Sequence, residues 1–417
     1  MVDKMKAKYN LREDANLIID RAIRDVQPDH AVAKALKNLE LPQGKVVAVA
    51  LGKAAWQMAK AAKDVLRDRI STGVIITKYE HAKGEIEPFR IFEAGHPVPD
   101  KNSFLATKYA ADLVGNLTDK DLVIMLISGG GSSLFEIPLC TEEDLQDMTR
   151  QLLACGADIT EMNIVRKRLS AVKGGKFAEL CHPAQVFAVV LSDILGDPLD
   201  MIASGPAYPD SSTVEMCQEV VKKYNLVLTE NVKGLLEQET PKKCENVTTV
   251  VTGSVRQLCV SAERTCRELG YEPFVLTSSL NCIAREAGAF LGAIAKQYRN
   301  AKKPMAFLAG GETVVHLTGK GLGGRNQELA LSAAEAIRGM ENVAVFSFGS
   351  DGTDGPTDAA GGFVDGGTFE KLEREGCRIS SVLAQNDAYH ALEKCDGLIK
   401  TGSTGTNVND LACILIR

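Results

Sequence analysis

Short apolar runs alternate with amphipathic segments along nearly the whole chain. In the first half, apolar runs of strand length cover residues 45–51, 73–77, 90–92, 121–127 and 186–191. Segments with apolar positions at helical spacing lie at 14–39, broken at Pro28, and at 54–67, 103–113, 141–155 and 159–169. Strands that alternate with helices in this way predict a parallel or mixed sheet covered by helices on both faces.

The second half repeats the pattern after a polar interruption. Strands are predicted at 247–252, 273–277, 305–309, 343–349, 397–400 and 411–416, with an antiparallel-looking piece at 313–318 and helices between them. The polar segment 237–245 separates the halves and contains Pro241. We therefore predict two Rossmann-like α/β/α domains, an N-terminal domain over residues 1–240 and a C-terminal domain over residues 241–417.

Composition narrows the class of protein. The chain has 417 residues, of which 45% are hydrophobic and 24% charged, as expected for a soluble globular protein with large cores. A net charge of -6 gives no electrostatic footprint for nucleic acid. The 11 cysteines form neither a CxxC pair nor a zinc pattern, and no signal peptide or membrane-length apolar run occurs. We expect a cytoplasmic protein with small-molecule partners, no nucleic acid and no membrane.

A glycine loop follows the most apolar strand. Residues 121–127 lead directly into Ser128, Gly129, Gly130, Gly131, Ser132 and Ser133. Glycines let backbone N–H groups converge on one oxyanion, and the serines add hydroxyl donors, so a phosphate or carboxylate would fit. A plain turn between strand and helix is the alternative. Similar Gly, Ser/Thr and Asp clusters follow other strands, at 192–198, 310–313, 349–357 and 401–409, which favours the ligand site.

Two basic side chains accompany glycine-rich strand ends. Lys53 lies just after the first strand and at the start of a helix, where an ammonium group could hold a phosphate or carboxylate. The alternative is an ordinary exposed lysine. His96, in a Gly-His-Pro turn, is the one histidine in a glycine-rich loop.

Carboxylates also cluster after strands. Asp193 follows the strand at 186–191, and Asp351 and Asp354 lie in the glycine-rich loop after the strand at 343–349. Mg²⁺ on phosphate substrates uses one or two carboxylates, so Asp193 and Asp351 are candidate metal ligands, and Asp193 is also a candidate general base. Capping of turns and helices is the alternative.

A further glycine cluster precedes Arg325. Gly319, Gly321 and Gly324 fit G-x-G-x-x-G, but no acidic residue follows at the distance that a dinucleotide site needs. We interpret Gly321, Gly323 and Gly324 as making room for Arg325, whose planar fork suits a carboxylate or phosphate. The sequence has no Walker A motif and no protein-kinase signature.

These motifs together resemble the glycerate 2-kinase family, whose C-terminal region is called MOFRL. The matching segments run in order along nearly the whole chain: 49–55, 93–100, 128–134, 165–167, 172–175, 191–193, 202–206, 310–313, 323–328, 351–361 and 404–407. Departures are small, with Ser133 where many relatives have Ala and Ala207-Tyr208 where many have Thr-Val; they bear on substrate breadth.

The resemblance implies ATP-dependent phosphorylation of D-glycerate to 2-phosphoglycerate, with Mg²⁺, in a cleft between two domains. It implies that Lys53 and Arg325 are the catalytic pair, with Asp193 as the further catalytic candidate. The remaining expected substrate or nucleotide contacts are Ser128, Gly129, Gly130, Gly131, Ser132, Ser133, Lys173, Glu312, Thr313, Asp351, Asp354 and His96.

Other readings stay open. The family has also been labelled hydroxypyruvate reductase, an activity that would need nicotinamide binding at residues 319–324. A sugar-acid sensor would bind the same anion without turnover. We expect a monomer or homodimer whose two halves close on the substrates, because phosphoryl transfer needs water kept out.

Overall fold

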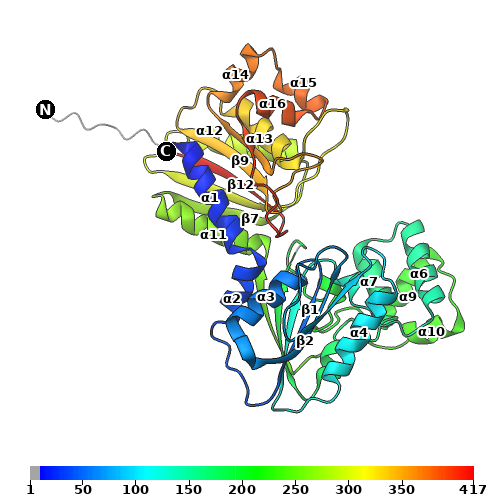
Figure 1. The fold of residues 1–417 in the computed structure, drawn as a ribbon. Coiled ribbons are helices and arrows are strands. Elements are labelled where there is room, and N and C mark those ends of the chain that lie inside the picture. The colour runs from blue at the N-terminus through cyan, green and yellow to red at the C-terminus, as the bar shows by residue number, and fades with distance from the viewer. Residues whose placement is uncertain (1–9, 193) are drawn as a thin grey trace. The chain divides into compact units, whose positions relative to one another are not determined.

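The computed structural model describes residues 10–192 and 194–417 and divides into two compact units (Figure 1). The first, here called the parallel-sheet unit, contains residues 28–192 and 197–252. The second, the mixed-sheet unit, contains residues 10–27, 194–196 and 253–417. Within these described residues, no helix is long and apolar enough to cross a membrane.

The parallel-sheet unit is built on six strands in the order β3-β2-β1-β4-β5-β6. They are β1 Val46–Leu51, β2 Ile70–Lys78, β3 Phe89–Ala94, β4 Leu122–Ile127, β5 Gln185–Leu191 and β6 Val247–Gly253. Every residue of the central strands β1 and β4 is buried, which explains their uninterrupted apolar runs. These two strands pair in parallel with Leu51 opposite Ile127, so both end at the same edge of the sheet.

Helices surround this sheet and extend beyond it. They are α2 Pro28–Leu36, α3 Ala55–Leu66, α4 Lys101–Val114, α5 Gly131–Leu134, α6 Glu142–Ala154, α7 Ile159–Arg168, α8 Lys176–Cys181, α9 Val214–Tyr224 and α10 Glu230–Leu236, with short 3-10 turns at Arg67–Arg69 and Ile202–Ser204. Helices α2 and α3 pack into the core of the sheet. Helices α6, α7, α9 and α10 share a separate apolar cluster, visible beside the sheet in Figure 1.

The mixed-sheet unit has six strands in the order β11-β10-β9-β12-β8-β7. They are β7 Glu272–Leu280, β8 Met305–Gly311, β9 Val343–Gly349, β10 Gly361–Asp365, β11 Leu398–Ile399 and β12 Asp410–Ile416. Strand β7 is parallel to β8, whereas β12 is antiparallel to both β8 and β9. The prediction of a parallel or mixed sheet in each half is confirmed: the first sheet is parallel and the second is mixed.

Two local predictions in this unit were wrong. Residues 313–318 form no strand; Val314 makes an isolated bridge to Ile283. Strand β10 was missed, because it follows a Gly/Asp-rich loop and itself contains two glycines. Close neighbours leave no room for a side chain at either glycine; a Cβ on Gly361, for example, would be 1.9 Å from the Ser347 carbonyl oxygen.

The helices of this unit include the N-terminal one. They are α1 Leu11–Asp25, α11 Val255–Glu268, α12 Ala284–Tyr298, α13 Arg325–Ala336, α14 Thr368–Arg374, α15 Ile379–Ala384 and α16 Ala388–Lys394. Helix α1 lies beside α11 (Figure 1) and buries Ile18 and Ile19 in the same core as Phe346. The compact units therefore differ from the expected 1–240 and 241–417 division, because α1 docks on the mixed sheet and β6 completes the parallel one.

Candidate functional site

The loop after β1 is joined to the glycine loop after β4. Gly52 has φ 109°, and a Cβ there would lie 2.3 Å from Ser128 Oγ. The N–H of Lys53 donates to the Gly129 carbonyl oxygen at 2.9 Å. Ser128 Oγ donates to the Leu51 carbonyl at 3.2 Å and accepts the Ala54 N–H at 3.1 Å. The Ser128 hydroxyl thus holds two loops together instead of facing a ligand as expected.

The side chains of Lys53 and His96 meet over Gly130. A Cβ on Gly130 would lie 3.0 Å from His96 Cδ2 and 3.2 Å from Lys53 Cγ. Burial lowers the pKa of His96, and the nearby positive charge of Lys53 lowers it further, so the ring is neutral at pH 7. Lys53 itself is exposed. The structure therefore brings three of the predicted residues together at one sheet edge.

The backbone of the glycine loop has N–H groups that no described acceptor uses. Among the described residues, the N–H groups of Gly130, Gly131 and Ser132 have no acceptor. Ser133 Oγ donates back to the Gly130 carbonyl at 3.2 Å, and Ser132 Oγ lies 2.9 Å from Ser204 Oγ. Unpaired N–H groups beside a lysine favour an oxyanion. We call Lys53, His96 and residues 129–132 the oxyanion cradle.

Lys173 is not part of this cradle. Its side chain is fully buried, and Nζ donates to Glu136 Oε2 at 2.6 Å and to the Phe135 carbonyl at 2.8 Å. Burial lowers the pKa of Lys173 to about 8, although Glu136 opposes the shift. The expected ligand contact is replaced by an internal ion pair.

Arg325 begins α13 in the mixed-sheet unit and is held by two carboxylates. Its Nε and Nη2 donate to Asp410 Oδ2 and Oδ1 at 2.5 and 2.9 Å, and Nη1 lies 3.1 Å from Glu312 Oε1. Burial raises the pKa of Asp410, against the opposing effect of Arg325. The sequence analysis missed Asp410; its signal is a carboxylate that opens the apolar strand β12.

Asp354 is a buried helix cap. It accepts the N–H groups of Asn326 at 3.1 Å and Gln327 at 2.9 Å, in the first turn of α13. A Cβ on Gly324 would lie 2.2 Å from Asp354 Cγ, so glycine is required there. Burial raises the pKa of Asp354 to about 7. The expected ligand is thus a structural residue that positions Arg325.

Asp351 lies close to Asp410. A Cβ on Gly349 would lie 3.3 Å from Asp351 Oδ1 and 3.4 Å from Asp410 Oδ1. Asp351 Oδ1 also accepts the Thr353 N–H at 2.9 Å. Thr313, which directly follows Glu312, is buried. Within the part of the chain that the structure describes, no three His, Cys, Asp or Glu side chains are grouped as a metal site. Asp193 lies outside the described residues.

The glycines before Arg325 pack against the turn between α15 and α16. A Cβ on Gly319 would be 2.3 Å from Gln385 Cα, and one on Gly321 would be 2.4 Å from Asp387 Cβ. Gly319 and Gly321 therefore allow close packing of two loops. For Gly321 this is a different reason from the room for Arg325 that was expected. Beside them, an open groove of about 620 Å³ is lined by Arg325, Glu312 and Lys320 among others.

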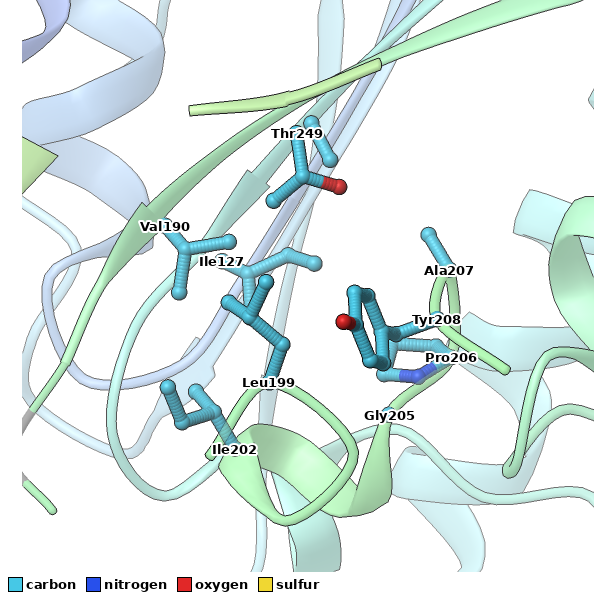
Figure 2. Close-up of a pocket in the computed structure, with 10 residues that line it drawn as sticks. Ile127, Val190, Leu199, Ile202, Gly205, Pro206, Ala207, Tyr208 and Thr249 are labelled. Carbon is cyan, nitrogen blue, oxygen red and sulfur yellow. The ribbon is translucent and has the colours of Figure 1, made fainter. Parts of the chain in front are cut away.

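A second hollow lies in the parallel-sheet unit near the ends of β4 and β5. Figure 2 shows Ile127, Val190, Leu199 and Ile202 around it, with the ring of Tyr208 opposite. Its free space is about 10 Å³, room for about one water molecule. No substrate fits this apolar slot in the present conformation. Among the described residues, the predicted site residues gather instead at the groove beside Arg325 and at the oxyanion cradle.

Two family models match the sequence. Residues 14–237 match a domain of unknown function, DUF4147, and residues 305–410 match the MOFRL family.

The chain is 52% identical to D-glycerate 2-kinase of Thermotoga maritima, over 98% of this chain and 99% of the relative. It is 38% identical to glycerate 2-kinase of Pyrococcus horikoshii, over 98% of each. Two relatives from Agrobacterium vitis, 39% and 37% identical, are provisionally named hydroxypyruvate reductases; the matches cover 89% and 97% of this chain and 100% and 94% of the relatives.

Solved structures agree with these matches. A crystal structure of glycerate kinase from Thermotoga maritima superposes with a TM-score of 0.93 at 51% identity, covering 98% of this chain and 99% of that one. A Pyrococcus horikoshii structure gives the same TM-score and coverage at 38% identity. With full-length matches at this identity and a shared fold, the chain belongs to the glycerate 2-kinase family.

Proposed function

We propose that this protein transfers the γ-phosphoryl group of ATP to O2 of D-glycerate, giving 2-phosphoglycerate and ADP. The observation that carries the proposal is the oxyanion cradle, in which Lys53 and neutral His96 lie beside a glycine loop whose three N–H groups have no acceptor among the described residues. Phosphoryl transfer needs little covalent help from the protein; it needs donors placed where charge develops on the phosphoryl oxygens. The cradle offers such donors on a rigid sheet edge.

Lys53 has the central role in this proposal. Its backbone N–H is fixed to Gly129 at 2.9 Å, so the start of its side chain is anchored while the ammonium group stays free to reach a ligand. His96 stays neutral because of its burial and the neighbouring lysine, so it adds a hydrogen-bonding group without repelling Lys53.

Arg325 is proposed as the second catalytic cation. Asp410 fixes one edge of the guanidinium, whereas the Nη1 contact to Glu312 is exchangeable, since the Glu312 side chain is 43% exposed. A substrate carboxylate or phosphoryl oxygen could take the place of the Glu312 carboxylate at Nη1. Bidentate anchoring by Asp410 keeps the planar fork in one orientation for that exchange.

A divalent cation is part of the proposal. Glu312 and Asp410 bring two negative charges to the single positive charge of Arg325, and Asp351 lies close to Asp410. This excess of carboxylates suits a hard cation, and Mg²⁺ needs one or two of them besides water and phosphate oxygens. Asp351, which is half-buried and whose Oδ1 accepts one backbone N–H, fits as a ligand; Mg²⁺ would neutralise phosphate charge. Asp193 remains a candidate ligand or base from the sequence.

The alternative reductase activity has less support. It would need a nicotinamide site at residues 319–324, where the glycines pack against Gln385 and Asp387. A cytoplasmic location, and a monomeric or homodimeric state, remain predictions.

Two assays on the purified protein test the proposed function. The first couples ADP release to NADH oxidation with D-glycerate and ATP, using L-glycerate as the control. The second follows NADH or NADPH oxidation with hydroxypyruvate alone. We expect turnover in the first assay and none in the second. Turnover in the second would establish the reductase, and D-glycerate binding without turnover in either would establish the sensor.

A further inference from the structure

Helix α7 ends in three consecutive basic residues, Arg166, Lys167 and Arg168. The side chains of Lys167 and Arg168 bind partners inside the protein. Lys167 Nζ lies 2.9 Å from Asp210 Oδ1, and Arg168 Nη1 donates to Ser212 Oγ at 2.9 Å with Asp210 close by. Both side chains are buried. The sequence gives no reason to separate Arg166 from these neighbours, but the structure does.

Arg166 is a partly buried arginine with few partners. Its one hydrogen bond among the described residues is from Nη2 to the carbonyl oxygen of Ser132, at 3.2 Å. Its Nε is buried and has no partner there. A guanidinium carries five N–H donors, and a buried donor without an acceptor, such as this Nε–H, is costly. Such an arginine is incomplete without a further acceptor.

The nearest carboxylate does not supply that acceptor. Glu136 Oε2 is taken by Lys173 at 2.6 Å, and no ion pair joins Glu136 to Arg166. Two positive charges therefore share one negative charge behind the glycine loop. Burial lowers the pKa of Arg166, and the charge of Glu136 opposes this shift. Glu136 Oε1 is buried and, among the described residues, has no hydrogen-bond partner either.

Helix α7 is also tied to the glycine loop one turn earlier. Asn163 Oδ1 accepts the Ser204 hydroxyl at 2.7 Å, and Ser204 Oγ lies 2.9 Å from Ser132 Oγ. Ser204 has φ 60°, and its neighbour Ala203, with φ 52°, places its Cβ against Gly131. Because Asn163 and Arg166 are three residues apart, they lie on one helix face. Arg166 bonds Ser132 directly, whereas Asn163 is linked to Ser132 through Ser204.

We propose that Arg166 binds an oxyanion of a substrate at the glycine loop, as a second cation of the cradle that contains Lys53. The ligand class is a carboxylate or a phosphate, completed by the N–H groups of residues 130–132. This inference rests on the proposed function, because it takes the substrates to be D-glycerate and ATP. It assigns substrate binding to Arg166, which the sequence motifs alone do not distinguish from Lys167 and Arg168.

The test compares Arg166→Lys and Arg166→Gln with the wild type. The matched control is Arg150→Gln, in which an arginine of the same unit, 72% exposed and paired with Asp147, is removed. Circular dichroism and melting curves check folding. Calorimetric titrations with D-glycerate, ADP and inorganic phosphate measure binding without turnover, and KM values for D-glycerate and ATP are measured separately.

Arg166→Gln is expected to weaken one class of ligand by about 10- to 100-fold, the range of a lost charge-assisted hydrogen bond. Arg166→Lys should lose less, and Arg150→Gln should match the wild type. A selective loss for D-glycerate identifies the carboxylate as the ligand, and a selective loss for ADP, phosphate and ATP identifies the phosphates. Unchanged binding of all ligands in a folded variant overturns the inference and leaves the proposed function standing.

A second measurement needs no variant. Phenylglyoxal modifies accessible arginines, and peptide mapping follows residue 166 in the wild-type protein with and without each ligand. Protection of Arg166 by D-glycerate or by ADP supports the inference, and equal modification with and without both contradicts it. If the wild type shows Arg166-dependent phosphate binding but no kinase turnover, the proposed function fails and the oxyanion site remains.

Discussion

Replacing Gly130 by alanine separates the cost of backbone strain from damage to the oxyanion cradle. Gly130 has φ 87°, and an alanine in the left-handed region costs roughly 1–2 kcal/mol. The added methyl would lie 3.0 Å from His96 Cδ2, 3.1 Å from His96 Nε2 and 3.2 Å from Lys53 Cγ. These contacts are tight by a few tenths of an ångström, so both side chains must move away.

Gly156 provides the matched control. Its φ is 73°, and nothing lies within 4 Å of a Cβ placed there, so Gly156→Ala carries similar backbone strain without any contact. Both variants should melt a few degrees below the wild type, since 1 kcal/mol corresponds to about 2–4 °C in a unit of this size.

Turnover should separate the two variants. A displacement of about 1 Å at a reacting centre can cost about 100-fold, so Gly130→Ala should lose about that factor in kcat/KM for D-glycerate. Gly156→Ala should keep the wild-type rate. Equal rates for the two folded variants would refute the placement of Lys53 and His96 at the reaction centre.

Three further predictions concern the mixed-sheet unit. Arg325→Lys keeps the charge but loses the bidentate pair with Asp410. We therefore expect at least about a 10-fold rise in KM for D-glycerate or fall in kcat, with little change in ADP binding measured by calorimetry. Weaker ADP binding with unchanged D-glycerate kinetics would show that Arg325 binds the nucleotide instead. The pKa of Asp354 is raised to about 7 in the folded protein, against about 3.9 in the unfolded chain. The folded protein therefore holds this proton more tightly, and the resulting stabilisation is complete below pH 4 and is lost as pH rises through 7. Asp354→Asn should therefore show a flatter melting temperature between pH 5 and 8 than the wild type, and parallel curves would contradict the assignment. Turnover should fall to background in excess chelator and return with Mg²⁺, whereas full activity without a divalent cation would remove the metal from the account.

The sequence predicted elements that depend on local pattern. Strands β1 and β4 can be recognised in the sequence as uninterrupted apolar runs, because a central parallel strand is buried on both faces. The glycines that follow them mark where each strand ends. Lys53 and the glycine loop were each expected after a strand, but only the structure brings them together, through the Lys53 N–H and the Gly129 carbonyl oxygen.

Partners distant in sequence were not predictable. Several predicted ligands have a suitable residue type but form internal hydrogen bonds with residues distant in sequence; these are Ser128, Lys173 and Asp354. Asp410 was missed for the converse reason, because a single carboxylate at the start of an apolar strand gives no local sign that Arg325 lies opposite. Docking of α1 on the mixed sheet likewise depends on a surface that forms more than two hundred residues later.

The central claim is phosphoryl transfer to O2 of D-glycerate with Lys53 at the reaction centre. Phosphorus NMR of a reaction containing ATP and D-glycerate follows substrate and product directly, in the wild type and in Lys53→Ala. The account predicts 2-phosphoglycerate and ADP in equal amounts with the wild type, and a rate at least about 100-fold lower with the folded variant, because a preorganised cation near the phosphoryl group is lost. Formation of 3-phosphoglycerate, or a Lys53→Ala variant as fast as the wild type, would contradict it.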